Sequence, residues 1–352
     1  MAATTTFTIT PEKEASQLQF FRRQFLTTPP AVSPKDFDLR GKTAIVTGSN
    51  IGIGLECARQ LLDLGLTTLI LAVRDEAKGD AAAKDLSAGR TSLQPGQIQV
   101  WKLDLSSYPS VTAFAERART ALPQLHYLIL NAGIYRVNMV INPATGHEED
   151  MQTNYLSTAL LVLLFIRVLS TKNAPASPGK IVMVSSDTAG WTTFAERDAD
   201  PLLPAFDDKT AKWDMQMRYG ASKLLGQLFL TELARRIPPS VAVVNAANPG
   251  FCYGSGLTRD AKGTLLGYVV DAYARIVGRS SAVGARTLVD AAVRKGRESH
   301  GQYVEDGEIG PMAPIVYKPE GARVMSRLWK ETLDELSFAG VKEIVGQFSD
   351  RQ

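Results

Sequence analysis

Short apolar runs alternate with longer helical patterns along most of this chain, and this alternation limits the folds that it can adopt. The runs are Thr43–Thr47, Thr68–Val73, Ile98–Leu103, Tyr127–Leu130, Ile181–Val184 and Val241–Asn245. The helical patterns between them are Gly52–Leu64, a charged segment ending at Leu86, Ser110–Leu122, His147–Leu169 and Tyr219–Arg236. Such runs are typical of parallel strands that helices bury on both faces. The pattern therefore predicts an α/β fold with a doubly wound, mostly parallel sheet.

The charge balance argues against nucleic acid or an anionic membrane surface as the main partner. The 352 residues include 39 Lys and Arg against 36 Asp and Glu, and no long basic run. Binding to phosphate backbones relies on clustered positive charge. The two cysteines cannot build a disulfide framework, and together with the three distant histidines they give no zinc-ligand spacing. We therefore expect a small-molecule substrate and no metal.

The apolar segments are too short to span a bilayer. The longest, Leu156–Leu169, is interrupted by Ser157, Thr158 and Arg167. A bilayer span needs about 20 apolar residues, so this stretch is typical of a buried helix. The N-terminus lacks the cationic start and apolar block of a secretory signal. These features predict no membrane span and a cytoplasmic location.

The chain is expected to form one central domain, over 37–318, with an extension at each end. Residues 1–36 are rich in Thr and Pro and predict an N-terminal extension. Within it, Ala15–Leu26 has the pattern of a short amphipathic helix that could lie on the body. Residues 319–352 predict a C-terminal helical tail with a helix at Pro319–Leu336.

Two long segments interrupt the alternation: an insertion at 187–217 and a lid at 254–281, with a helical pattern in Leu265–Ile276. Connections this long are usually functional or disordered. Both follow the carboxyl ends of strands, where open α/β sheets bind ligands, so we expect them to form much of a substrate pocket. The residues expected to line it are Trp191, Phe194, Phe206, Trp213, Tyr253, Leu257, Leu265 and Tyr268. They favour a mid-sized, largely apolar or aromatic substrate.

A glycine-rich turn follows the first strand. Gly48 permits a tight turn, Gly52 lets the backbone approach a pyrophosphate, and Gly54 lets the helix pack near the strand. The helix that follows presents unpaired N–H groups to an anion. The turn therefore predicts dinucleotide binding. The cofactor contacts predicted here are Gly48, Ser49, Asn50, Ile51, Gly52 and Gly54.

The spacing Gly-x-x-x-Gly-x-Gly, with Thr47 before it, resembles that of the short-chain dehydrogenase/reductase family, and the resemblance extends over about residues 37–305. It implies a single Rossmann-type domain with a seven-stranded, mostly parallel sheet and helices on both faces. It also implies hydride transfer between a nicotinamide cofactor and a carbonyl or secondary alcohol. The overall pattern is similar to fungal members associated with secondary metabolism and, more distantly, to retinol and steroid dehydrogenases.

The end of the second strand favours NADP(H) over NAD(H). A carboxylate there binds a ribose 2′-hydroxyl, whereas an arginine accepts a 2′-phosphate. The family's NAD-specific aspartate corresponds to Val73, and Arg74 matches the arginine of many NADP enzymes. The alternative is that Arg74 is a solvated arginine and that Asp75 only caps the next helix. No basic residue lies in the glycine turn, so a second NADP marker is missing.

Three further elements match the family's cofactor site. Asp104 resembles the aspartate that contacts adenine, and its alternative role is to cap the next helix. Asn131 begins the Asn-Ala-Gly element beside the cofactor. Pro249 and Gly250 resemble the turn at the nicotinamide.

The continuation of that turn departs from the family pattern. The usual valine and threonine are replaced by Cys252 and Gly254, which removes one phosphate contact that Ser255 could supply. Cys252 has no histidine near it in sequence, and we interpret it as a packing residue of the nicotinamide pocket. His147 lies in an acidic helix start that the helix dipole favours, and a metal role is not expected.

Tyr219 opens a helical pattern, and Lys223 lies four residues later, so both side chains project from one helix face. A free tyrosine has a pKa near ~10, which is high for acid–base work at neutral pH. A neighbouring ammonium stabilises the phenolate and is expected to lower that pKa. Such pairs also occur as simple packing. The match to the family's Tyr-x-x-x-Lys motif implies that Tyr219 is the catalytic acid/base, and that Lys223 tunes it and binds the ribose.

Two further catalytic residues are implied by the resemblance. Ser186 matches the family's catalytic serine, which holds the substrate oxygen, whereas Ser185 is expected to make a strand-end bond. Asn154 matches the asparagine that holds a water near the lysine. Its alternative role is packing against a backbone carbonyl inside the helix.

The sequence thus predicts an NADP(H)-dependent oxidoreductase, with a homodimer or homotetramer suggested by the resemblance. The terminal extensions could cover the usual association surface. One alternative is a dinucleotide-binding sensor or scaffold without turnover. Another is an isomerising or pericyclic role with NADPH as a spectator.

Overall fold

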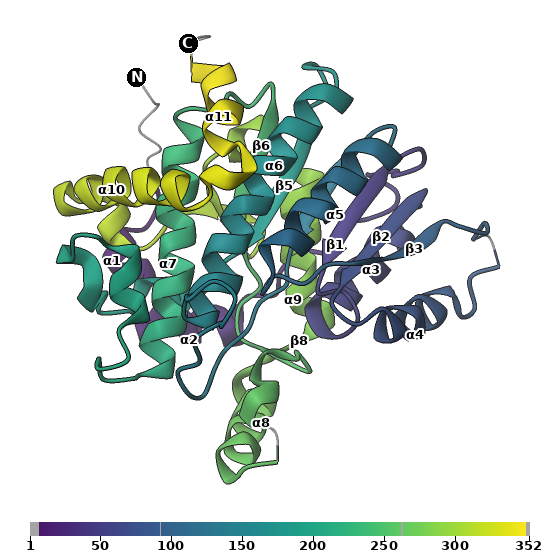
Figure 1. The fold of residues 1–352 in the computed structure, drawn as a ribbon. Coiled ribbons are helices and arrows are strands. Elements are labelled where there is room, and N and C mark those ends of the chain that lie inside the picture. Colours follow the sequence, from purple (N-terminus) through teal and green to yellow (C-terminus); the bar gives the residue numbers. More distant parts are fainter. Residues whose placement is uncertain (1–6, 92, 262, 350–352) are drawn as a thin grey trace.

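An eight-stranded sheet with the order β10-β9-β6-β5-β4-β1-β2-β3 forms the centre of the molecule (Figure 1). The computed structural model describes residues 7–91, 93–261 and 263–349. The strands are β1 (Thr43–Thr47), β2 (Thr68–Val73), β3 (Ile98–Lys102), β4 (Tyr127–Leu130), β5 (Gly179–Val184), β6 (Ala242–Asn248), β9 (Tyr303–Glu305) and β10 (Glu308–Gly310). All of them except β10 run parallel, which confirms the predicted doubly wound α/β fold.

The sheet has one strand more than the seven predicted. β10 pairs antiparallel with β9 at the edge, across the turn Asp306-Gly307, where φ is +50° and +87°. Positive φ at both central residues suits a tight hairpin and is typical of Asp-Gly. β10 spans only three residues and has no apolar run, so the alternation pattern did not reveal it.

Helices cover both faces of the sheet. One face carries α3 (Gly52–Asp63), α4 (Glu76–Ser87) and α9 (Ser281–Val289), and the other carries α5 (Tyr108–Ala121), α6 (Ser157–Lys172) and α7 (Met215–Ala234). Alternate residues of β1 enter the two cores, because Ala44 and Val46 pack with the first set and Ile45 with the second. Burial on both faces explains why the strands are apolar throughout.

The start of α7 is set by Asp214. Its carboxylate accepts the backbone N–H groups of Gln216 and Met217 at 2.9 and 3.0 Å. Such a cap satisfies donors that have no partner within the helix. The helix therefore begins at Met215, and Tyr219 lies in its second turn rather than opening it, as the sequence had suggested.

A π-helical turn, Met151–Leu156, precedes α6, where the sequence predicted one regular helix. Together they form a 22-residue stretch, Met151–Lys172, which among the described residues is long and apolar enough to cross a membrane. However, 83% of its apolar window is buried inside the fold, as in the core helix of a globular protein. Single π turns are frequent at functional sites.

The insertion 187–217 contains three 3₁₀ turns, Asp187–Gly190, Ala195–Asp198 and Leu203–Asp207. Phe194 and Phe206 stack with their ring centroids 6.3 Å apart and are buried in the main core. They anchor the insertion on the body. Phe206 is fully buried in the core rather than at a pocket surface as expected, whereas Phe194 also borders a cavity shared with Leu224 of α7.

The segment 254–281 stands away from the sheet, with α8 (Leu265–Val277) at its tip (Figure 1). The short strands β7 (Cys252–Tyr253) and β8 (Arg279–Ser280) pair at its base. Leu265 and Tyr268 are 81% and 68% exposed. These two residues therefore face outward in this structure, rather than lining a closed pocket as expected.

Both ends of the chain contain helices. The N-terminal end contains α1 (Pro11–Glu14) and α2 (Gln17–Leu26), where the sequence suggested one amphipathic helix. The C-terminal end contains α10 (Pro319–Glu335) and α11 (Val341–Ser349), which pack against α7 and α6.

His147 links the start of the π turn to the insertion and to α10. Its Nδ1 lies 2.9 Å from Asp207 Oδ2, and its Nε2 lies 3.0 Å from Glu335 Oε1. Burial acts to lower the pKa of His147, but hydrogen bonds to the two carboxylates outweigh it and raise the pKa to about 9. His147 is therefore an imidazolium held by two acids at neutral pH.

We expect His147→Gln to remove a pH-dependent part of the stability. A histidine with a raised folded-state pKa stabilises fully below its unfolded pKa of about 6.5, and this contribution is lost as pH rises through the folded value. The loss of unfolding free energy caused by the substitution should therefore shrink by about 2 kcal/mol between pH 7 and pH 9.5 in urea denaturation. His126, whose pKa burial lowers to about 4, provides the control, and His126→Gln should show little such trend. A constant effect of His147→Gln over this range would contradict the ion-pair assignment.

Candidate active site

The glycine turn brings the start of α3 very close to β1 and to the end of β4. Gly48 has φ of +62°, and a Cβ there would lie 2.9 Å from Ala132 Cα. A Cβ on Gly54 would lie 2.5 Å from both the Gly48 carbonyl oxygen and Asn131 Nδ2. No side chain fits at either position, so the turn requires glycine.

Asn131 and Thr47 tie this turn to the end of β4 by hydrogen bonds. Asn131 Nδ2 donates to the carbonyls of Thr47 and Gly48 at 3.0 and 3.2 Å. The Ala132 N–H donates to Thr47 Oγ1 at 2.9 Å. The structure therefore gives Asn131 a bracing role, because its amide points into the turn.

The start of α3 fits a pyrophosphate. Ile51 stands at the cap position without a side-chain hydrogen bond to the helix, so the first N–H groups of α3 are left to a ligand. Ser49 is buried, and its hydroxyl donates to the Val46 carbonyl at 2.8 Å. The Ser49 side chain therefore turns into the protein, away from the cofactor contact predicted for it.

The first residues of the lid lie against the same turn. A Cβ on Gly52 would be 3.0 Å from Ser255 Cα and 3.2 Å from the Gly254 carbonyl oxygen. This contact puts Ser255 beside the predicted pyrophosphate position, where the family's threonine is missing.

Arg74 and Arg259 lie near one another beyond β2. Arg74 is exposed at the strand end, and Asp75 caps α4 by accepting the Lys78 N–H at 3.2 Å. Burial and the charges of Arg74 and Arg136 lower the pKa of Arg259. The two positive charges repel one another, so an anion bound between Arg74 and Arg259 would be stabilised. The sequence did not reveal Arg259, because the lid brings it back from 185 positions along the chain.

Asp104 makes local bonds at the end of β3. Its Oδ1 accepts from the backbone N–H and the hydroxyl of Ser106 at 3.0 and 2.7 Å. The cap of the next helix is instead Ser107, whose Oγ accepts from the Ser110 N–H at 3.3 Å, so the alternative role of Asp104 as that cap was wrong.

Tyr219 and Lys223 are buried on α7 beside the end of β5. Lys223 Nζ donates to the Val184 carbonyl at 2.8 Å and lies 5.6 Å from the centroid of the Tyr219 ring. The Tyr219 ring also packs edge-on against Tyr135, with centroids 4.9 Å apart. The two side chains thus share one space, as their spacing predicted.

The pKa of Tyr219 lies above its ordinary value, opposite to the expectation. Burial and the charge of Asp150 raise it, whereas a hydrogen bond with Ser186 lowers it. Burial lowers the pKa of Lys223 to about 8, opposed by Asp150. Burial disfavours the charged form of the Tyr219 phenol. The Lys223 ammonium, which is bonded to the Val184 carbonyl, does not outweigh this penalty.

Ser186 and Ser185 have separate roles at the end of β5. Ser186 Oγ accepts from the backbone N–H and the hydroxyl of Thr188 at 3.3 and 3.0 Å. Its hydrogen bond with Tyr219 acts to lower the pKa of that phenol. The Ser185 N–H continues the sheet by donating to the Ala247 carbonyl at 2.9 Å, as expected for that residue.

Asn154 lies in the π turn and ties β4 to α7. Its Oδ1 accepts from the Ile134 N–H, and its Nδ2 donates to the Ile134 carbonyl, each at 2.9 Å. Nδ2 also donates to Ser222 Oγ at 3.1 Å, between Tyr219 and Lys223 in sequence. The side chain thus joins the segment after β4 to α7, and both ends of its amide are hydrogen-bonded within the protein.

The turn after β6 is closed by a hydrogen bond from its backbone to the side chain of Asn248. The Gly250 N–H donates to Asn248 Oδ1 at 3.0 Å, and Pro249 lies between them. Cys252 is buried behind it, and burial raises the pKa of this thiol to about 12. A thiol with so high a pKa packs rather than reacts.

Comparisons with known proteins can now be set beside this geometry. Residues 42–196 match a family described as short chain dehydrogenase. The chain is 52% identical over 343 residues to "Short-chain dehydrogenase fogG" of Aspergillus ruber, covering 97% of this chain and 98% of that one. It is 44% identical over 328 residues to "Short chain dehydrogenase/reductase mfmJ" of Annulohypoxylon moriforme, covering 93% of each. A solved structure from Mycobacterium paratuberculosis superposes with a TM-score of 0.60 and 26% identity, over 88% of this chain and 98% of that one.

We expect Gly54→Ala to impair dinucleotide binding. The new methyl group would collide with the Gly48 carbonyl and displace the turn from α3. The Kd for NADPH, measured by fluorescence titration, should rise at least about tenfold. Gly346→Ala is the matched control, because a Cβ there meets nothing within 4 Å. Unchanged NADPH binding by a folded Gly54→Ala protein would contradict the placement of the cofactor on this turn.

Proposed function

The chain belongs to the short-chain dehydrogenase/reductase family, and we propose that it is an NADP(H)-dependent oxidoreductase acting on a carbonyl or secondary alcohol. The observation that carries the proposal is the meeting of Tyr219, Lys223 and Ser186 at the end of β5, beside the uncapped start of α3. A pure dinucleotide binder has no chemical need for this set of groups.

The side chains divide the chemistry among them. A bound nicotinamide would supply or accept hydride. Tyr219, whose raised pKa keeps it protonated, would donate its phenolic proton to the carbonyl oxygen during reduction. The Ser186 hydroxyl would hold that oxygen next to the phenol. In the reverse direction, Tyr219 would receive the proton from the alcohol.

Lys223 is suited to carry charge and protons beside Tyr219. With a pKa of about 8 it is mostly protonated at neutral pH, yet it can release a proton at modest cost. Asn154 would support it by fixing α7 against the end of β4 through Ser222.

The proximity of Arg74 and Arg259 supports the preference for NADP(H). A 2′-phosphate placed between two guanidinium groups would relieve their repulsion and accept charge-assisted hydrogen bonds. Val73 at the strand end has no group to bind a ribose hydroxyl.

The aromatic residues of the lid and of the segment just before it support a mid-sized, largely apolar or aromatic substrate. Phe251 and Tyr273 pack together with ring centroids 5.7 Å apart, and Tyr253 is partly exposed nearby in sequence. The likeness to fungal relatives supports a place in secondary-metabolite biosynthesis.

We expect Tyr219→Phe to lower kcat for NADPH-dependent reduction at least about 100-fold, because no group is left to protonate the carbonyl oxygen. Turnover is followed by nicotinamide absorbance with a panel of aromatic and alkyl aldehydes and ketones. Tyr108→Phe, which removes a half-buried phenol bonded to Glu335, provides the control. Equal turnover by wild type and Tyr219→Phe would refute the catalytic role. Tight NADPH binding without consumption by the wild type would favour a sensor or scaffold.

We expect Arg74→Ser and Arg259→Ser each to reduce the preference for NADPH. The ratio of kcat/KM for NADPH to that for NADH should fall about tenfold, since each variant loses one charged contact to the 2′-phosphate. Arg40→Ser removes an arginine paired with Asp38 and should leave the ratio unchanged. Should both site variants keep the wild-type ratio, the two arginines do not read the 2′-phosphate.

A further inference from the structure

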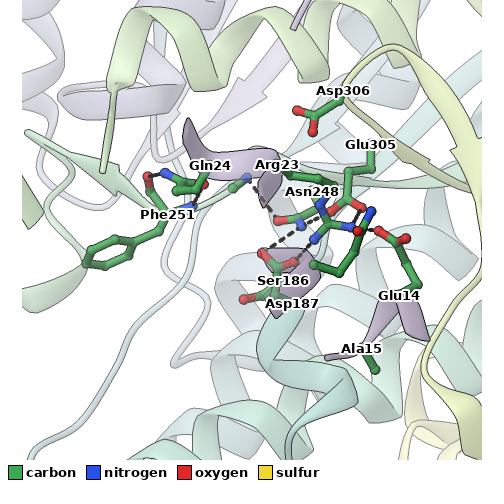
Figure 2. Close-up of polar contacts among 12 residues, drawn as sticks. Glu14, Ala15, Arg23, Gln24, Ser186, Asp187, Asn248, Phe251, Glu305 and Asp306 are labelled. Carbon is green, nitrogen blue, oxygen red and sulfur yellow. Dashed lines mark hydrogen bonds and ion pairs between the residues drawn. The ribbon is translucent and has the colours of Figure 1, made fainter. Parts of the chain in front are cut away.

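The N-terminal helix α2 reaches the catalytic edge of the sheet through Arg23 (Figure 2). The guanidinium of Arg23 forms ion pairs with Glu14 of α1, Asp187 after β5 and Glu305 at the end of β9. Only 12% of the Arg23 side chain is exposed. Asp187 directly follows Ser186, so an N-terminal arginine holds the neighbour of the proposed catalytic serine.

Asp187 is held from a second side by Asn248. Asn248 Nδ2 donates to Asp187 Oδ2 at 2.9 Å and also to Glu305 Oε1 (Figure 2). Asn248 ends β6 and precedes the Pro249-Gly250 turn. The cluster therefore joins the serine end of β5 to the predicted nicotinamide turn after β6.

α2 also contacts the chain just beyond that turn. Gln24 Nε2 donates to the Phe251 carbonyl at 2.6 Å, and the Phe251 N–H donates to Gln24 Oε1 at 3.3 Å. Arg279, paired with Asp306 at 2.5 Å, donates to the Arg23 carbonyl at 2.8 Å. These bonds fix the position of α2 along its axis and its rotation about that axis. They therefore set the direction from which Arg23 approaches Asp187.

Arg23 supplies the positive charge that faces the three carboxyl groups of this cluster. Burial and the charge of Asp187 raise the pKa of Glu305, whereas the charge of Arg23 opposes this shift. Burial acts to lower the pKa of Arg23, but Glu305 and Asp187 outweigh it and raise that pKa. Asp187, 10% exposed, thus relies on Arg23 for its nearest positive charge among the described residues. Loss of that charge would leave a nearly buried carboxylate free to swing towards solvent.

The turn that begins at Asp187 is clamped on its other side by α7. A Cβ on Gly220 would lie 2.6 Å from the Thr188 carbonyl oxygen, and Gly220 directly follows Tyr219. Thr188 in turn donates to Ser186 Oγ. Movement of this turn would therefore change the position of the Ser186 hydroxyl relative to the Tyr219 phenol.

We propose that Arg23 is a positioning residue of the reaction site, which acts through Asp187 to fix the turn that carries the Ser186 hydroxyl. The N-terminal helix is then part of the catalytic apparatus. The kinetic part of this inference rests on the function proposed above, but the structural part does not.

The kinetic test compares Arg23→Met, Asp187→Asn and the double variant. kcat should fall at least about tenfold in each single variant. The double variant should lose little more, because both substitutions remove the same Arg23–Asp187 ion pair. The Kd for NADPH should stay within about twofold, since neither residue touches the glycine turn. Arg23→Lys, which keeps the charge, should recover part of the activity.

Two controls separate positioning from simple attachment of α2. Arg22→Met changes the exposed neighbour on the same helix and should keep wild-type kcat. Phe20→Ala removes a ring that packs on Trp191 at 5.1 Å, so it weakens docking of α2 without changing its charge. Phe20→Ala should lower the melting temperature while kcat changes less than in Arg23→Met. An equal loss of kcat in Phe20→Ala, or wild-type kcat in a folded Arg23→Met, would overturn the proposal.

Hydrogen exchange tests the structural part without any substrate. Amides of residues 186–190 should exchange at least about twofold faster in Arg23→Met and in Asp187→Asn than in Arg22→Met. Unchanged exchange there would overturn the proposal even if the enzyme is active. Faster exchange in a protein that turns over no carbonyl would instead leave Arg23 as the anchor of this turn and count against the proposed function alone.

Discussion

The parallel pairing of β1 with β4, and of β4 with β5, decides where every functional group of this molecule lies. The register places Val46 opposite Ile129 and Leu130 opposite Met183, so the three strands end at nearly the same level. The glycine turn after β1, the Asn-Ala-Gly element after β4 and the pair Ser185-Ser186 after β5 therefore lie side by side. Chain order reverses direction between β1 and β4, and ligands of open α/β sheets bind at such a reversal. Chemistry at this edge follows from strand pairing before any side chain is considered.

Elements dictated by local pattern could be predicted from the sequence. β1, β2 and β4 have the expected bounds, because a parallel strand buried on both faces must be apolar along its length. The Tyr219–Lys223 pair was found because residues four apart lie about one helical turn from each other.

Contacts between segments that are distant in sequence left no such pattern. Arg23 lies 164 positions from Asp187 and 282 from Glu305, and Arg259 reaches the region of Arg74 only through the lid. Phe206 was misplaced because an aromatic insertion looks the same in sequence whether it lines a pocket or fills a core.

The electrostatics of Tyr219 and Lys223, the pair proposed to be catalytic, also depend on burial that the sequence does not display. Spacing alone suggested that Lys223 lowers the pKa of Tyr219. In the fold, burial favours the neutral form of each group, and the buried carboxyl of Asp150 raises the pKa of both. A phenol that holds its proton is ready to donate it, whereas a lysine with a pKa of about 8 can pass one on near neutral pH. The arrangement is therefore better suited, before any further charge enters the site, to giving a proton to a carbonyl than to removing one from an alcohol.

The choice of residues that attach α2 is difficult to explain by stability alone. Taking an arginine and several carboxylates out of water costs free energy that their attraction only partly returns, and apolar residues of similar size would usually stabilise at least as well. α2 already buries Phe20 against Trp191, which could suffice for attachment. What an ion-pair cluster adds is direction, because guanidinium and carboxylate groups pair only within a narrow range of geometries. A directional contact is useful where an atom must be held in place, and here that contact ends one residue from the Ser186 hydroxyl. The polar anchor of α2 therefore makes more sense as a device for geometry than as a source of stability.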